Sequence, residues 1–592
     1  MREPFDFRTW KSVLIEIHWS SGTVSTSSLL RNQQLNKTRP SMKIRALIAV
    51  TIAAAIGLSA ALTALTAQAT EQVEPSAINR ILDEGFDRSQ LSQIAAHLTD
   101  RIGGRMTNSP QMREAEKWTQ EQFRAWGLTN IHLEGFEFGR GWSIEKSSVR
   151  MISPRTKVLR SIPIAWTPPT NGVLTAPVVL APMRRERDFA KWKGTLRGKI
   201  VLISKPERSS EPDKPSFERM TDERLIELSE YRQPRHSEAE IARTLKEAKF
   251  DDQLDAFLAE EGALAWVRMS YRDAGLVTGE GYGHRVGMTP KLAGIELAAE
   301  DYRQLARLTR TDAVPTIEII SDVKYHDEDT KAYNVIADIP GRDPKAGYVM
   351  AGAHLDSWVA ADGAGDNAAG SAVIMEAARI LSKLSIGPKR AIRFALWSGE
   401  EQVLGGSLAY IEKHLATRAP STDPVANELH PYYGWQNRWP ITPSPGYYDL
   451  AAYFNVDNGS GKIRGIYAEG NPAVVPIFRE WFEPFESMGA ATISSQRTGA
   501  TDHELMQAVG IPAFQFIQDP LDYGARIHHS SIDSYDHLQI EDLKQAAVIL
   551  ASFLLNAANL EESLPRMPLP TRPSVTDPFA YEDPDEEDET AE

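Results

Sequence analysis

A set of histidine and carboxylate side chains in the second half of the chain has the types and spacing of a metal site. The 592-residue sequence contains no cysteine, so a metal would be held by imidazole and carboxylate groups alone. That donor set is typical of catalytic zinc, and two histidines with three carboxylates suit a pair of Zn2+ ions that share one carboxylate. The candidate ligands are His354, Asp366, Glu401, Asp457 and His529, with Glu400 next to Glu401 as a further candidate site residue.

The local sequence around these candidates strengthens the metal interpretation. Asp356 follows His354 by two residues, and a ligating imidazole needs an acceptor on its other nitrogen. Glu400 and Glu401 would repel each other as neighbours, a conflict that a nearby cation removes. Asp366 lies on a Gly-rich turn that would let its backbone approach a metal. It could equally be the N-cap of the helix that follows, and both interpretations stay open.

Strands must position these side chains, because the candidates lie where apolar runs end. Alternating strands and helices predict an α/β fold, with a mixed, mostly parallel central sheet and helices on both faces. Open sheets of this kind bind ligands beyond the carboxyl ends of their strands, where the candidates are found. The predicted strands are 333–339, 348–353, 392–397, 450–456 and 513–517, and the predicted helices are 368–384, 404–414 and 539–558.

The first half of the chain has a different pattern. Apolar residues spaced three and four apart predict helices at 78–100 and 110–126. A turn-rich region of short strands follows from 142 to 323. Within it, 207–253 is dense in charge and has helical spacing, so we interpret it as a surface insertion and expect His236 to be solvent-exposed.

At the candidate residues the sequence resembles the co-catalytic dizinc exopeptidases, a family that includes bacterial leucyl aminopeptidases and glutamate carboxypeptidases. It is most similar to the plasma glutamate carboxypeptidase branch, for which Thr99–Gly103 and Trp142 are the closest strings. The other matching motifs are His354-Leu-Asp356-Ser-Trp, Asp366, Glu400-Glu401, Asp457, Thr501-Asp502-His503 and His529-Ser530.

The resemblance implies two Zn2+ ions per chain and a division of the ligands between them. Asp366 is expected to bridge the ions, with His354 and Asp457 on one and Glu401 and His529 on the other. The family pattern has His followed by Ser or Thr and then an acidic residue, which His529-Ser530 with Asp533 satisfies. His528 is out of frame, and we leave open that it faces the substrate.

The resemblance also implies the chemistry. Glu400 is expected to act as general base toward a zinc-bridging hydroxide that hydrolyses terminal peptide bonds of peptides or dipeptides. Asp356 is expected to orient His354. Two alternatives stay open, a glutaminyl cyclase-like acyltransferase with one zinc and a non-catalytic receptor-like binding protein. The choice between aminopeptidase and carboxypeptidase is open as well, with Tyr523 and Arg526 as candidate substrate contacts.

The matching regions, roughly 75–145 and 325–560, imply a β-rich protease-associated domain inserted into the peptidase, with Leu196–Ile203 as its most recognisable string. The expected division is a non-native or disordered extension at 1–41, a signal peptide at 42–69, the first part of the peptidase at 70–145, the protease-associated domain at 146–323 with its charged insertion at 207–253, the main part of the zinc peptidase at 324–563, and a disordered acidic tail at 564–592.

The charge and the targeting signals of the sequence limit which partners and which cellular location we expect. The formal charge is −15, of which nine negative charges fall between Asp577 and Glu592, so the rest of the chain carries −6 and no basic stripe for nucleic acid. Lys43 and Arg45, the apolar run Ala46–Leu65 and a small-residue cleavage pattern predict a signal peptide, with Met42 as the true start. A membrane anchor is the alternative. We therefore expect an exported, periplasmic or secreted enzyme with peptide substrates, no nucleic acid and no stable membrane anchor, and leave open a homodimer.

Overall fold

The computed structural model describes residues 75–207, 215–230, 238–281, 290–420, 422, 432 and 434–571. The predicted extension, signal peptide, His236 and most of the acidic tail lie outside these residues. Within them, no helix is both long enough and apolar enough to span a membrane.

A mixed eight-stranded sheet forms the centre of the peptidase region, in the order β1-β10-β12-β11-β15-β18-β16-β17. The neighbours β12, β11, β15 and β18 run parallel to one another. On one side of them, β10 pairs antiparallel with β12, and β1 pairs antiparallel with β10. The strands are β1 (Thr129–Glu137), β10 (Lys331–Ile339), β11 (Tyr348–His354), β12 (Ala391–Trp397), β15 (Leu450–Asn455), β16 (Ile463–Tyr467), β17 (Thr492–Ser494) and β18 (Ala513–Gln518). The predicted strands are present with nearly the expected bounds.

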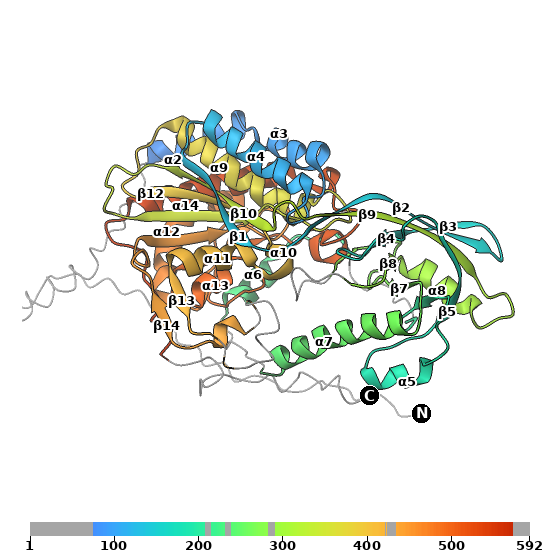
Figure 1. Cartoon of the computed structure of the whole chain (residues 1–592). Helices are drawn as coiled ribbons and strands as arrows, with labels where there is room; N and C mark the ends of the chain where they lie inside the picture. Colours follow the sequence, from blue (N-terminus) through green and yellow to red (C-terminus); the bar gives the residue numbers. More distant parts are fainter. Residues whose placement is uncertain are drawn as a thin grey trace, which may run out of the picture. The chain divides into compact units, whose positions relative to one another are not determined.

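Helices cover both faces of this sheet, as Figure 1 shows. On one face, α2 (Pro75–Asp87), α3 (Leu91–Ala96), α4 (Pro110–Ala125), α9 (Ala369–Leu384) and α14 (Ile540–Asn559) enclose the larger apolar core. On the other face, α11 (Gly405–His414) and α13 (His503–Gln507) pack over a second core. Both faces are covered, so β15 and β18 are buried along their whole length and consist mostly of apolar residues, as parallel strands in such folds usually do.

The helix predicted at 78–100 is instead two helices and a final π-helical turn, His97–Ile102. The break falls between α2 and α3, where the Ser89 hydroxyl accepts a hydrogen bond from the Leu91 backbone N–H at 3.2 Å. The backbone N–H of Gln90 is bound by the Glu376 carboxylate at 3.2 Å. Polar side chains that satisfy free N–H groups start a new helix here, and apolar spacing alone did not reveal this boundary.

A second eight-stranded sheet has the order β3-β2-β9-β5-β6-β7-β8-β4. Its strands are β2 (Gly141–Ser153), β3 (Lys157–Leu159), β4 (Ser161–Pro163), β5 (Leu174–Leu180), β6 (Ile200–Leu202), β7 (Ala265–Met269), β8 (Gly294–Leu297) and β9 (Thr316–His326). The β-rich pattern of this region is therefore present, and its assignment to a protease-associated domain stays a prediction.

Helices accompany the second sheet as well. They are α5 (Phe189–Trp192), α7 (Glu238–Glu260) and α8 (Ala299–Leu308). The helix α6 (Asp222–Ser229) instead packs against β17 of the central sheet. The helix α7 runs past the predicted end of the charged insertion, and Leu258 near its end is fully buried. This helix therefore contributes to the core of the second sheet as well as to the surface. The remaining elements are α10 (Glu400–Val403), α12 (Val475–Phe482) and a short antiparallel pair, β13 (Ala416–Arg418) and β14 (Ile441–Pro443).

Candidate metal centre

The predicted site residues meet at the carboxyl ends of the parallel strands. His354 is the last residue of β11, Glu400 and Glu401 begin α10 just after β12, and Asp457 follows β15 by two residues. Asp366 lies in the turn Ala364–Ala368 before α9, and His529 in the loop between β18 and α14. Because these parallel strands end at the same edge of the sheet, residues that are far apart in the sequence converge there.

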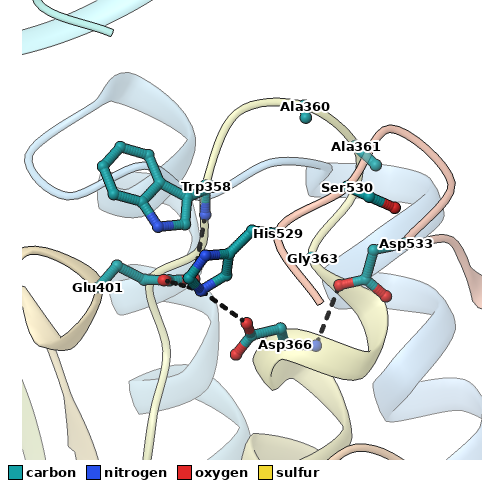
Figure 2. A pocket seen from close by; sticks show the side chains of 9 residues that line it. All are labelled: Trp358, Ala360, Ala361, Gly363, Asp366, Glu401, His529, Ser530 and Asp533. Atoms are coloured by element: carbon teal, nitrogen blue, oxygen red, sulfur yellow. Dashed lines mark hydrogen bonds and ion pairs between the residues drawn. The ribbon is translucent and has the colours of Figure 1, made fainter. Parts of the chain in front are cut away.

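The two oxygens of Asp366 face different histidines. Asp366 Oδ1 lies 3.2 Å from His354 Nε2, and Asp366 Oδ2 lies 3.2 Å from His529 Nε2. The other carboxylates divide in the same way. Asp457 Oδ1 is 3.3 Å from His354 Nε2, and Glu401 Oε2 is 3.0 Å from His529 Nε2. The cluster therefore has two halves that share Asp366; Figure 2 shows the half that contains His529.

Glu400 approaches the His354 half without joining it closely. Its Oε2 lies 4.0 Å from His354 Nε2. Gly399 before it has a φ of +72°, a left-handed conformation that turns the chain from β12 into α10 and that glycine adopts without strain. This turn lets the two adjacent glutamates reach different parts of the cluster.

Asp356 contacts the site differently from the expectation. The Nδ1 of His354 lies 3.0 Å from the main-chain oxygen of Asp356, whereas the nearer carboxylate oxygen is 3.8 Å away. The carboxylate instead accepts the backbone N–H groups of Glu400 and Glu401, each at 3.3 Å, and the Thr107 hydroxyl at 2.9 Å. Asp356 thus links β11 to the start of α10.

Asp533 and Arg105 fix the loops that carry the ligands. The Asp533 carboxylate accepts the backbone N–H groups of Gly365 and Asp366 at 2.6 and 3.0 Å. The fully buried Arg105 guanidinium donates to five main-chain carbonyls, those of Leu98, Gly103, Leu355, Asp362 and Gly363. The Gly-rich turn is therefore held from two sides.

The electrostatics of the cluster are those of crowded, buried negative charge. Burial and the nearby Asp366 together raise the pKa of Glu401 to about 8, against the lowering effect of His529. Burial also raises the pKa of Glu400 well above its ordinary value. For His354, burial favours the neutral ring, but the carboxylates Asp457 and Glu400 raise its pKa well above the usual range.

These residues fit a pair of metal ions. Asp366 Oδ2 is buried and has no partner in hydrogen-bonding geometry, although His529 is near. Three overlapping sets of ligand atoms each lie within 4.8 Å of one another, and Asp366 belongs to two of them. All donors are imidazole nitrogens and carboxylate oxygens, which suit Zn2+. A cation at each half would relieve the repulsion among the carboxylates.

Several neighbours of the site were not found from the sequence. Thr107, Arg105 and Glu280 come from segments remote from the metal motifs, and no local pattern marked them. His528 lies close to the cluster: its ring stacks on that of His529 with centroids 3.7 Å apart, and its Nε2 is 3.6 Å from Asp366 Oδ2. Its role and the preference for His529 stay predictions. Of the candidate substrate contacts, Tyr523 is half-buried and Arg526 is exposed.

Solved structures share this fold. A peptidase M28 precursor from Shewanella amazonensis superposes with a TM-score of 0.57 at 21% identity and covers 84% of this chain and 99% of its own. A zinc aminopeptidase from Bacillus subtilis superposes with a TM-score of 0.51 at 20% identity, covering 80% and 95%. The predicted α/β fold class is thereby confirmed.

Curated relatives point to the same class. Carboxypeptidase Q from Mus musculus is 23% identical over 478 residues, which cover 79% of this chain and 86% of the relative. Carboxypeptidase Q from Homo sapiens is 23% identical over 480 residues, which cover 80% of this chain and 86% of the relative. Leupeptin-inactivating enzyme 1 from Streptomyces exfoliatus is 30% identical over 182 residues, 30% of this chain and 34% of the relative.

Fold and site together define a metallopeptidase. Residues 334–554 match the family model described as Peptidase family M28. The predicted family and enzyme class are therefore confirmed.

Proposed function

We propose that this chain is an exported exopeptidase with two zinc ions, and that it removes terminal residues from peptides or dipeptides. The observation that carries the proposal is the division of the Asp366 oxygens between two histidines, each with a further carboxylate. We assign His354 and Asp457 to one ion, Glu401 and His529 to the other, and Asp366 to both. Zinc bound there would polarise the scissile carbonyl and lower the pKa of water.

The chain's own residues would then move one proton. Glu400 is the proposed general base, because it lies beside the cluster without pairing closely to either histidine. It would take a proton from the attacking water and deliver it to the leaving amine. The Asp356 carboxylate would fix Glu400 by accepting the Glu400 backbone N–H. The Asp356 main-chain oxygen would fix the His354 ring by binding its Nδ1. The Trp358 backbone N–H donates to Glu401 Oε1 at 3.2 Å, and Trp358 lines the pocket beside the cluster (Figure 2).

The proposed location rests on the sequence between Met42 and Ala69, which has the order of a signal peptide. The mature protein would begin at Thr70. N-terminal sequencing of the protein recovered outside the cytoplasm tests this. A protein that retains the apolar run Ala46–Leu65 at its N-terminus would favour a membrane anchor.

Activity and metal content can be tested together. The protein is purified, its zinc is counted by elemental analysis, and cleavage of dipeptides blocked at either terminus is followed before chelation, after chelation and after zinc is restored. We expect two zinc ions per chain and activity that chelation abolishes and zinc restores. Only one blocked set should be cleaved, which separates aminopeptidase from carboxypeptidase. One zinc per chain together with cyclisation of N-terminal glutamine would overturn the proposal.

A further inference from the structure

A carboxylate from the second sheet reaches the metal centre. Glu280, in the connection between β7 and β8, places its Oε1 2.8 Å from Nδ1 of His529, 249 residues further along the chain. We propose that Glu280 is a positioning residue that fixes the His529 ring, so that the second sheet helps to build the metal site. The inference rests on the proposed zinc role of His529.

The ring geometry is that of a metal-ligating histidine whose other ring nitrogen is bound by an acceptor. The two nitrogens of His529 have separate partners. Nδ1 faces Glu280, and Nε2 faces Asp366 and Glu401 at 3.2 and 3.0 Å. A carboxylate that accepts the Nδ1–H leaves the Nε2 lone pair directed at the metal and makes the imidazole a better donor. A ring turned over would direct a proton at the metal.

Glu280 is itself held in place. The Tyr271 hydroxyl donates to Glu280 Oε1 at 3.1 Å, and the Arg268 guanidinium donates to the Glu280 main-chain oxygen at 2.7 Å. Arg268 also pairs with the buried Glu296 at 2.6 Å, and Glu296 in turn accepts the Thr278 backbone N–H at 2.7 Å. A network of this kind limits the positions that the Glu280 carboxylate can take.

The segment 271–280 is also bound to the loop that carries His529. Arg272 donates to the main-chain oxygens of Gly524, Ala525 and His528 at 3.2, 3.0 and 2.9 Å. Val277 and Ser531 exchange two hydrogen bonds, one from each backbone N–H.

The backbone of His529 depends on such support. Its φ is +57°, a left-handed conformation that costs a non-glycine residue of order 1 kcal/mol or more and persists only where the surroundings impose it. The docking of segment 271–280 therefore acts on the backbone of His529, and Glu280 acts on its ring.

The test measures zinc affinity in the full chain by competition with a chelating dye. Four proteins are compared, wild type, Glu280→Ala, Glu280→Gln and the control Glu318→Gln. Glu318 lies on β9 of the same sheet and pairs with Arg150 at the surface. Each substitution is repeated in a His354→Ala background, where the His529 half is the remaining site. Thermal unfolding of every variant verifies its fold.

We expect Glu280→Ala to weaken one of the two zinc sites by about 10- to 100-fold and to leave the other unchanged. Glu280→Gln keeps an acceptor oxygen and should fall between Glu280→Ala and wild type. Arg272→Met serves as a second arm, because it loosens the loop but keeps Glu280 opposite His529. If it equals Glu280→Ala in the affinity of that one site, docking rather than ring orientation is responsible and the inference is overturned.

Equal zinc affinities in Glu280→Ala and wild type, with two ions bound to both, would overturn this inference and leave the proposed function intact. A wild-type protein that binds no zinc would overturn both.

Discussion

The two histidine halves of the site are built in different ways. His354 ends a central strand, is 1% exposed, and finds the acceptor for its Nδ1 two residues along the chain. His529 lies on a loop, is 21% exposed, and finds the acceptor for its Nδ1 in Glu280, in the distant connection between β7 and β8. The His354 ring is therefore oriented by the end of its own strand, whereas the His529 ring is oriented only when two distant regions dock.

The His354 half should therefore tolerate substitutions in its surroundings better than the His529 half. A ligand on a buried strand is held by the core that the strand completes, so its geometry is as stable as the fold. A ligand on a loop is held by a few polar contacts, each of which contributes about 1 kcal/mol. We expect substitutions around His529 to alter metal binding without altering the fold.

The largest expected effect is on the kcat of Glu400→Gln, which tests whether the proton transfer takes place beside the His354 half. Glu400 is bound through its backbone to Asp356, which also carries the acceptor for His354. Glu400→Gln should lower kcat by about 10²- to 10⁴-fold, because the amide cannot take the proton from water. Steady-state kinetics and elemental analysis measure this. Both zinc ions should remain, and a kcat near that of wild type would remove Glu400 from the role of base.

The second prediction concerns stability in the absence of metal. His354→Ala should lower the free energy of unfolding by about 1–3 kcal/mol, because it opens a cavity and leaves a buried main-chain oxygen without its donor. His529→Ala should cost less, because water can reach its site. Thermal unfolding of the two chelated variants measures the order, and an equal or reversed order would break the contrast between the halves.

The third prediction concerns the order in which the ions leave. Limited chelation should remove the zinc of the His529 half first, about tenfold faster than the other, because its ligand is more exposed and depends on Glu280. Release is followed with a chelating dye in wild type. His354→Ala and His529→Ala, which retain one half each, assign the two phases. A slower phase from the His529 half would contradict the expectation that its zinc is held more weakly.

The smallest expected effect is on the His354 half. Thr107→Val removes the hydroxyl that binds the Asp356 carboxylate and should reduce kcat by less than about tenfold, the equivalent of roughly 1 kcal/mol. Zinc affinity of the His529 half should change less than kcat, because Thr107 reaches that half only through the Asp356 carboxylate and the backbone N–H of Glu401. Thr311→Val, at an exposed position after α8, is the matched control. A selective loss at the His529 half would show that the two halves are coupled.

Much of the fold and the cluster was predictable because the signals are local. An apolar run followed at once by His354, by Glu400 or by Asp457 marks both the strand and the edge at which its ligand lies. What the sequence did not reveal depends on tertiary contact. Glu280, Thr107 and Arg105 reach the site from other segments, and nothing in their neighbours distinguishes them from surface residues. The break between α2 and α3 was missed for the same reason, since Gln90 is bound by the distant Glu376.

The Arg105 guanidinium has a consequence for how far the protein can be shortened. Its five carbonyl partners belong to the segment 98–103 and to the loop 355–363, and it is fully buried between them. A fragment that starts at residue 334, where the family match begins, would leave the oxygens of Leu355, Asp362 and Gly363 unsatisfied in the interior. The smallest unit able to work thus extends beyond the residues of the family match, and its N-terminal boundary lies before Leu98.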